Sequence, residues 1–394
     1  RFDYNDKEDM FDRHSYAKGG RILHMLRYYL GEDAFYNGLK KYLNDNAYKS
    51  VEIHQLRIAM EAVSGEDLNW FFNQWFLASG HPLLVVNYGY DHEENQQIVN
   101  IEQVQDQSNT PVYRLPFSID IYVDGEVQRH LVNMTQEKQQ FIFNVSKKPS
   151  NVIVDAEHML LAKIFDKKSD DMWLEQMNAP LYMDSKMALQ NISNENKSQA
   201  VIHAINNKFW GIRLMGVIKA TQLKDKNACL ELIEKLAKHD ANTKVRSASL
   251  NFLLTLNNKD DYTNLFESAT KEQSLLVARS GLNGLDQVNP EKALSLAPQF
   301  EEDLSSKYLV SRIYSNYGGP EKISYFQNLL PNLEIEDWKD IYFLLNYMRF
   351  LENQKLIIIL DGMPALEKIF KDVPWMVGVK NLQSHLREIK STIT

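Results

Sequence analysis

Cysteine is almost absent from this chain of 394 residues, which contains only Cys229. A single cysteine excludes an internal disulfide framework and any metal site built from several cysteines. Because Cys229 lies in an apolar pattern of helical spacing, we predict that it is a small buried side chain rather than a reactive thiol. The compartment stays open, since an exported bacterial protein can also lack disulfides.

Long apolar runs and basic blocks are missing as well. No apolar run approaches the length of about 18 residues that a membrane helix needs, so we expect no transmembrane segment in this chain. The net charge is −8, and no dense cluster of lysine and arginine occurs. Binding to nucleic acid needs a concentrated basic surface, and we therefore expect no nucleic acid partner.

The motifs of a self-contained hydrolase are missing too. Neither the zinc-binding motif His-Glu-x-x-His nor Gly-x-Ser-x-Gly nor a P-loop occurs. The nearest approach to a zinc motif begins at His92, but Gln96 stands in place of the second histidine, and the segment is typical of a polar turn. The chain also opens at Arg1 without an initiating methionine or a signal peptide. We interpret the sequence as a fragment or a processed product with no metal ligands of its own.

What is present indicates a multidomain α+β protein. Hydrophobic residues make up 44% of the chain and charged residues 24%, which is typical of a globular protein. Residues 1–79 show helical periodicity, with Gly31 placed to end one helix and an aromatic helix predicted to be core at 68–76. Residues 80–165 alternate with period two and contain the hairpin turn Asp124-Gly125, so we predict about seven strands in a small β-sandwich.

Residues 166–394 return to helical periodicity and contain an even spacing of arginines. Arg213, Arg246, Arg279 and Arg312 are each 33 residues apart. This period fits one helical hairpin per repeat and favours a HEAT-like stack, in which each pair of helices buries its apolar face on its neighbours. Chance spacing is the alternative. If the spacing is structural, we expect the arginines to tie adjacent repeats together rather than to take part in catalysis.

The segment 15–26, which contains Tyr16-Ala17-Lys18-Gly19, resembles the Tyr-x-Lys-Gly helix start of M1 family (gluzincin) zinc aminopeptidases. The resemblance continues through 30–35 and 64–68. It then includes Phe72-x-x-Trp75-Phe76 and Gly80-His81-Pro82, and it is dense from about residue 15 to 125. Within the family, the chain resembles bacterial enzymes of the alanyl or membrane aminopeptidase N type. No single motif is specific, and the evidence is their ordered series.

The resemblance implies a fold and an activity. The chain would comprise the helical end of a thermolysin-like catalytic domain at 1–79, a β-sandwich domain at 80–165 and an α-helical HEAT-like repeat domain at 166–394. Complete enzymes of the family use Zn²⁺ to hydrolyse N-terminal residues from peptides. Their metal ligands and the glutamate that binds the substrate amine lie N-terminal to the segment matched here, so the missing N-terminal zinc-binding region becomes an expected partner.

What the resemblance implies for this chain is a catalytic role for Tyr16, whose hydroxyl would stabilise the transition state. No metal ligand and no substrate-binding residue can be assigned. We expect the chain alone to be inactive. The alternative is a non-catalytic helical-repeat interaction protein, an inactive M1-like homologue. An exported or membrane-anchored bacterial protein is favoured over a cytoplasmic one, although the family includes both.

Overall fold

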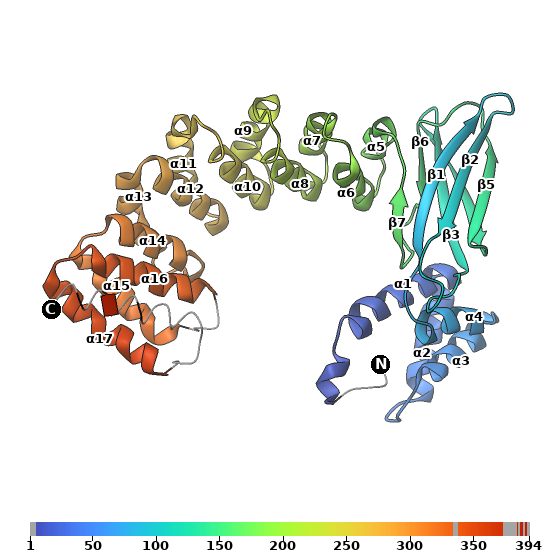
Figure 1. Cartoon of the computed structure of the whole chain (residues 1–394), viewed down its shortest axis with the longest axis horizontal. Helices are drawn as coiled ribbons and strands as arrows, with labels where there is room; N and C mark the ends of the chain where they lie inside the picture. The colour runs from blue at the N-terminus through green and yellow to red at the C-terminus, as the bar shows by residue number, and fades with distance from the viewer. Residues whose placement is uncertain (1–4, 334–337, 373–383, 385–386, 389–390, 392–394) are drawn as a thin grey trace. The chain divides into compact units, whose positions relative to one another are not determined.

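The computed structural model describes residues 5–333, 338–372, 384, 387–388 and 391. The chain divides into two compact units, Arg1–Asn196 and Lys197–Thr394 (Figure 1). The first unit combines helices with two β-sheets, and the second is helical in its described residues, so the mixed α+β class is confirmed. No helix in the described ranges is both long enough and apolar enough to cross a bilayer.

The first unit opens with helices that follow the apolar periodicity of the sequence. Gly31 ends the first long helix as predicted, with φ of +80°, a conformation that costs glycine little. Gly65 ends another helix in the left-handed region, with φ of +74°. The elements are η1 (Lys7–Met10), the π-helical turn η2 (His14–Lys18), α1 (Gly19–Leu30), α2 (Glu32–Asp45), α3 (Ile53–Ser64), α4 (Asn69–Phe72) and the π-helical turn η3 (Asn73–Leu77).

The strands of the first unit form two sheets. One has the order β5-β2-β1-β7 and the other has the order β4-β3-β6. β1 and β7 pair in parallel, whereas the other neighbouring strands are antiparallel. The turn between β3 and β4 has positive φ at Asp124 (55°) and Gly125 (79°), as the predicted type I′ turn requires. The strands are β1 (Leu83–Asp91), β2 (Gln96–Gln103), β3 (Leu115–Val123), β4 (Glu126–Met134), β5 (Lys138–Asn144), β6 (Asn151–Val154) and β7 (Lys163–Asp166).

One apolar core joins the N-terminal helices to both sheets. Leu26 of α1, Phe72 of α4, Val86 of β1 and Ile119 of β3 all belong to it and are at most 1% exposed. A polar contact adds to this packing, because Arg21 of α1 donates to the backbone carbonyl of Leu160 at 3.3 Å. Helix α1 is therefore fixed against the sheets. α5 (Asp170–Gln176) and α6 (Tyr182–Asn191) complete the first unit.

The second unit is built from helices in succession. Each even-numbered helix from α8 to α12 packs against the odd-numbered helix before it, and α8, α10 and α12 also pack against one another in turn. The helices are α7 (Lys197–Ile205), α8 (Trp210–Ala220), α9 (Leu230–His239), α10 (Thr243–Leu253), α11 (Thr263–Ala269), α12 (Leu275–Val288), α13 (Pro290–Leu296), α14 (Lys307–Tyr317), α15 (Ile323–Leu329), α16 (Trp338–Glu352) and α17 (Leu356–Asp372).

The four evenly spaced arginines lie on successive even-numbered helices of this unit. Arg213 lies on α8, Arg246 on α10, Arg279 on α12 and Arg312 on α14 (Figure 1). Each side chain is partly buried. The spacing of 33 residues is thus the spacing of one helical pair along the chain. The predicted domain bounds at residues 79 and 165 and the HEAT-like character of the helices remain predictions.

Candidate functional site

Tyr16, the predicted catalytic residue, lies in the π-helical turn η2 directly before α1. The turn forms because the N–H of Lys18 donates to the carbonyl of Arg13, five residues earlier, at 3.0 Å. Its N-terminal side is held by Asp12, whose carboxylate accepts from the N–H groups of His14 at 2.8 Å and Ser15 at 2.9 Å. The extra residue of a π-turn changes the direction in which its side chains leave the helix.

The Tyr16 side chain is 65% exposed in this chain. Its ring lies 6.1 Å from the ring of Phe11, and its hydroxyl has no hydrogen-bond partner among the described residues. An exposed phenol without a partner can donate its proton to an incoming oxygen. The residue is therefore available for the predicted role, although the role itself stays a prediction.

The surroundings of Tyr16 carry a fixed negative charge. The pKa of Asp12 is lowered to about 2, first because the N–H of Ser15 donates to its carboxylate and then because the side chain and N–H of His14 do so. Asp12 therefore stays ionised at neutral pH. A carboxylate at the N-terminal end of a helix also interacts favourably with the helix dipole, which favours the observed start of η2.

The described residues of this chain do not fit a zinc ion. Among the described residues, no group of three His, Cys, Asp or Glu side chains is arranged to hold a metal. The segment at His92 lies in the turn between β1 and β2, as predicted. A catalytic zinc site needs three protein ligands at about 2.0–2.2 Å, and the described residues around Tyr16 do not bring three such ligands together.

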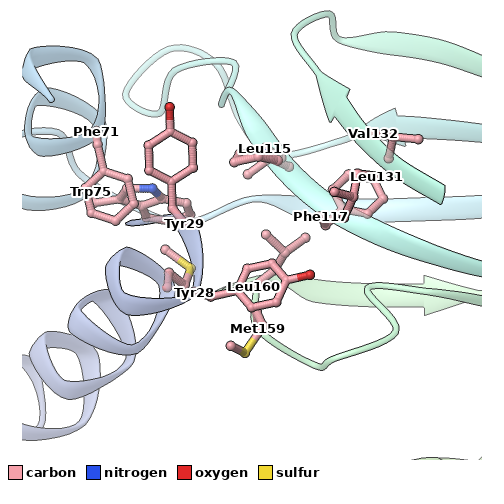
Figure 2. Close-up of a pocket in the computed structure, with 12 residues that line it drawn as sticks. Tyr28, Tyr29, Phe71, Trp75, Leu115, Phe117, Leu131, Val132, Met159 and Leu160 are labelled. Atoms are coloured by element: carbon pink, nitrogen blue, oxygen red, sulfur yellow. The ribbon is translucent and has the colours of Figure 1, made fainter. Parts of the chain in front are cut away.

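An apolar pocket of the first unit opens near the other end of α1. It has a volume of about 430 Å³ and lies among α1, the aromatic helix and strands β3 and β4. Figure 2 shows Tyr28 and Tyr29 on the α1 side, facing the strand that carries Leu115 and Phe117. Phe71 and Trp75 line the pocket and also belong to the core. This confirms the prediction that the aromatic helix is core.

The pocket is not adjacent to Tyr16. Tyr28 follows Tyr16 by twelve residues on one nearly continuous helix, which places it about 18 Å further along the axis at 1.5 Å per residue. The pocket walls come from residues that lie far apart in the sequence, such as Tyr28, Leu131 and Met159. Reasoning from sequence missed the pocket for that reason, because no local pattern marks it.

A buried ionic cluster in the first unit was also missed. The side chain of Lys168 is fully buried, and its Nζ lies 3.4 Å from Oδ2 of Asp166 and 5.0 Å from the ring centre of Trp173. Asp166 also accepts from the hydroxyl of Tyr88 at 2.7 Å. Burial lowers the pKa of Lys168, against the opposing charge of Asp166. The cluster joins β1, β7 and α5 and serves the fold, since each of its groups has a partner.

Cys229 is placed as predicted. Its side chain is 1% exposed, and burial raises the pKa of its thiol to about 11. The thiolate is the reactive form of cysteine, so this residue is not a candidate nucleophile at neutral pH.

Comparison with known proteins bears on the segment that contains Tyr16. Residues 2–75 match the family model described as Peptidase family M1 domain. The chain is 25% identical over 221 residues to leucyl aminopeptidase of Saccharolobus solfataricus, an alignment that covers 55% of this chain and 24% of that protein. It is 28% identical over 143 residues to aminopeptidase N of Escherichia coli, covering 33% and 16%. The resemblance drawn from the sequence is thereby confirmed.

A solved structure shares the fold. Aminopeptidase A of Legionella pneumophila, in complex with aspartic acid, matches with a TM-score of 0.61 and 15% sequence identity. The match covers 94% of this chain and 51% of that protein. The chain thus spans about half the length of the solved aminopeptidase and aligns with a quarter or less of the two curated relatives named above.

Proposed function

Because residues 2–75 match the family model of the peptidase family M1 domain, we propose that this chain is the C-terminal portion of a zinc-dependent aminopeptidase that removes N-terminal residues from peptides. The observation that carries the proposal is the family match over the segment that contains Tyr16. The named relatives are aminopeptidases, and the fold resembles a solved aminopeptidase. Peptides are accordingly the proposed substrates.

In this proposal Tyr16 stabilises the transition state. Attack of water on a peptide carbonyl creates negative charge on the carbonyl oxygen, and a positioned hydroxyl donor lowers the energy of that charge. The exposed phenol of Tyr16 supports this role because no described group competes for its proton. Its place in a π-helical turn is a second support, since single π-turns occur frequently at functional sites.

The zinc ligands are proposed to come from a region outside this chain. The described residues contain no suitable cluster, and the aligned parts are minor fractions of the relatives. The partner of this chain would then be an N-terminal zinc-binding region. It follows that the chain alone should neither bind zinc in a one-to-one ratio nor hydrolyse aminoacyl substrates.

The remaining regions would follow the domain order of a family member. We infer that residues 1–79 end the catalytic domain, that residues 80–165 form a β-sandwich domain and that residues 166–394 form a HEAT-like repeat domain. The two sheets between residues 83 and 166 support the second assignment. The successive packing of helices and the placement of the four arginines on α8, α10, α12 and α14 support the third.

The test uses the product of the longest reading frame that encodes this chain, loaded with zinc. We predict that Tyr16→Phe lowers kcat for an aminoacyl substrate by on the order of 10²–10³ while KM changes little, because the lost hydroxyl acts mainly in the transition state. Tyr48→Phe is the matched control. Tyr48 is fully exposed in the same unit, and its substitution should leave both constants unchanged.

Two outcomes would contradict the proposal. A folded Tyr16→Phe variant with near-normal kcat would remove Tyr16 from the mechanism. A full-length protein that binds no zinc and hydrolyses no aminoacyl substrate would favour the non-catalytic interaction protein instead. Thermal melting of each variant shows whether a loss of activity is a loss of folding.

A further inference from the structure

The second unit contains a pocket on the even-numbered helices that is lined by several polar side chains as well as apolar ones. It has a volume of about 290 Å³ and is lined from α10, α12, α14 and the short turn before α14. Two of the evenly spaced arginines, Arg279 and Arg312, line it together. Its other polar walls include Ser247, Asn283 and Ser305. Two guanidinium groups in one pocket need either acidic partners within the protein or an anion from outside.

The other two evenly spaced arginines, Arg213 and Arg246, are each followed at a nearly constant interval by a carboxylate with which they pair. Arg213 pairs with Asp240, 27 residues later, at 2.6 Å. Arg246 pairs with Glu272, 26 residues later. These partners lie just beyond the next odd-numbered helix, so each pair ties one pair of helices to the following one. The interval predicts an acidic residue at position 305 or 306 for Arg279, and both positions are serines.

Position 305 is a serine. Arg279 donates through Nη1 to the hydroxyl of Ser305, and no described carboxylate lies within ion-pair distance of its guanidinium. The charge of Asp303 acts on it, but the oxygens of Asp303 already accept from the hydroxyl groups of Ser305 at 2.7 Å and Ser306 at 2.6 Å. The charge of Arg279 is therefore balanced less directly than that of Arg213 or Arg246.

The neighbouring side chains of Arg312 and Asn283 also favour an anion as the ligand of this pocket. Arg312 is paired with Asp286 through Nε at 2.9 Å and Nη2 at 2.6 Å, so Asp286 neutralises Arg312 and not Arg279. Asn283 accepts from Arg312 through its side-chain oxygen at 2.9 Å. Its amide N–H groups have no partner among the described residues. The pocket thus combines an incompletely paired guanidinium with an available amide donor.

From this arrangement we propose that the pocket on α10, α12 and α14 binds a carboxylate, with Arg279 as its principal partner and Asn283 as a second donor. A guanidinium matches a carboxylate through two parallel hydrogen bonds, which makes it selective for planar anions. The carboxylate can come from a small free acid or from the C-terminus of a peptide. This inference does not depend on the proposed peptidase activity.

Isothermal titration of the full chain distinguishes these sources and tests the site. The probes are an N-acetylated tripeptide with a free C-terminal carboxylate, the same peptide as its amide, acetate and inorganic phosphate. We expect the peptide acid or acetate to bind and the amide to bind at least about 10-fold more weakly, since it loses a charge-assisted pair. Binding of acetate identifies a small acid as sufficient, and binding of the peptide acid alone identifies a peptide C-terminus.

Three variants test the residues. Arg279→Gln should weaken binding by about 10-fold or more, whereas the control Arg246→Gln, which removes an arginine already paired with Glu272, should leave binding unchanged. Ser305→Asp restores the acid that the interval predicts. The new carboxylate should pair with Arg279 and abolish binding, while thermal melting shows that the chain stays folded. This variant keeps Arg279, so it tests the site without removing the arginine.

Several results would overturn the proposal. These are the absence of carboxylate binding at concentrations of about 10 mM, equal binding of the peptide acid and its amide, and tighter binding of phosphate than of carboxylate. Equal loss of binding in Arg246→Gln and Arg279→Gln would overturn it too, because it would indicate general loosening of the helices.

Discussion

Replacing Asp240 by asparagine tests whether the evenly spaced arginines hold neighbouring helix pairs together. Asp240 follows α9 and accepts from Nε and Nη2 of Arg213 at 2.6 and 2.9 Å. It also accepts from the N–H of Asn242 at 2.8 Å. The side chains of Asp240 and Arg213 are 2% and 16% exposed. Both charges are therefore largely withdrawn from water, unlike those of a surface pair.

The size of the effect follows from what remains after the substitution. Removing one partner of a buried ion pair costs about 3–5 kcal/mol, because the other charge is left without compensation. Arg213 keeps its hydrogen bonds to the carbonyls of Asn207 at 3.0 Å and Lys208 at 2.8 Å, and asparagine can still accept one. We therefore expect Asp240→Asn to lower the free energy of unfolding by about 2 kcal/mol. For a unit of this size, that lowers Tm by about 4–8 °C.

The effect should also depend on pH. Burial opposes the ionisation of Asp240, but the hydrogen bonds from Arg213 and Asn242 and the charge of Arg213 outweigh it, and they hold the pKa of Asp240 below its ordinary value. A lowered folded-state pKa stabilises the protein above the unfolded-state pKa. The difference in stability between wild type and Asp240→Asn should therefore be full above about pH 4 and shrink as the pH falls through the folded-state pKa.

Urea unfolding followed by circular dichroism at pH 7 and at pH 3 measures both effects. Lys271→Gln is the control, because Lys271 pairs with Glu267 at 3.6 Å and is 71% exposed. Such an exposed pair contributes less than about 0.5 kcal/mol. Equal losses in Asp240→Asn and Lys271→Gln would refute the reasoning, and so would a loss in Asp240→Asn that does not change with pH.

Two further predictions concern packing and reactivity. A Cβ at Gly281 would lie 2.6 Å from the carbonyl of Phe266 and 2.8 Å from the N–H nitrogen of Thr270, while a Cβ at Gly20 would meet nothing within 4 Å. In urea unfolding, Gly281→Ala should lower the free energy of unfolding by about 1–3 kcal/mol, and Gly20→Ala should raise it by about 0.5–1 kcal/mol. Changes of the same sign in the two variants would contradict this reasoning. The thiol of Cys229, with its pKa of about 11, should react with a chromogenic disulfide at pH 8 only after denaturation, and rapid reaction of the native chain would contradict its burial.

Sequence predicts those features of this fold that depend on a few consecutive residues. Gly31 ends α1, and Asp124-Gly125 forms the β3–β4 turn. Both could be predicted because each depends only on the backbone conformation of one or two residues. The alternating apolar residues of β3 are buried as their period indicates. The mixed α+β class follows from the same periodicities.

Features that depend on contacts between distant segments were not predicted. The pocket of Figure 2 needs Tyr28 of α1 beside Leu131 of β4 and Met159 of the loop after β6. The full burial of Lys168 could not be foreseen, because it lies in a charged stretch and depends on Asp166 and Trp173 from β7 and α5. Such neighbours are set by how the strands and helices pack, which no local pattern encodes.

The candidate site also combines a feature set by the local sequence with one that depends on distant parts of the protein. The sequence selects Tyr16 through its motif, and the local chain determines the π-turn that carries it. A hydroxyl donor is worth most where water is excluded, since water competes for the same hydrogen bonds and weakens the field around a developing charge. Tyr16 is 65% exposed in this chain, so in the proposed function this chain would supply the donor but not the dry surroundings. If the proposed function is correct, the zinc-binding region must cover Tyr16 as well as hold the metal. The exposure of Tyr16 should then fall when the two regions are joined, which solvent protection of its ring would reveal without any measurement of activity.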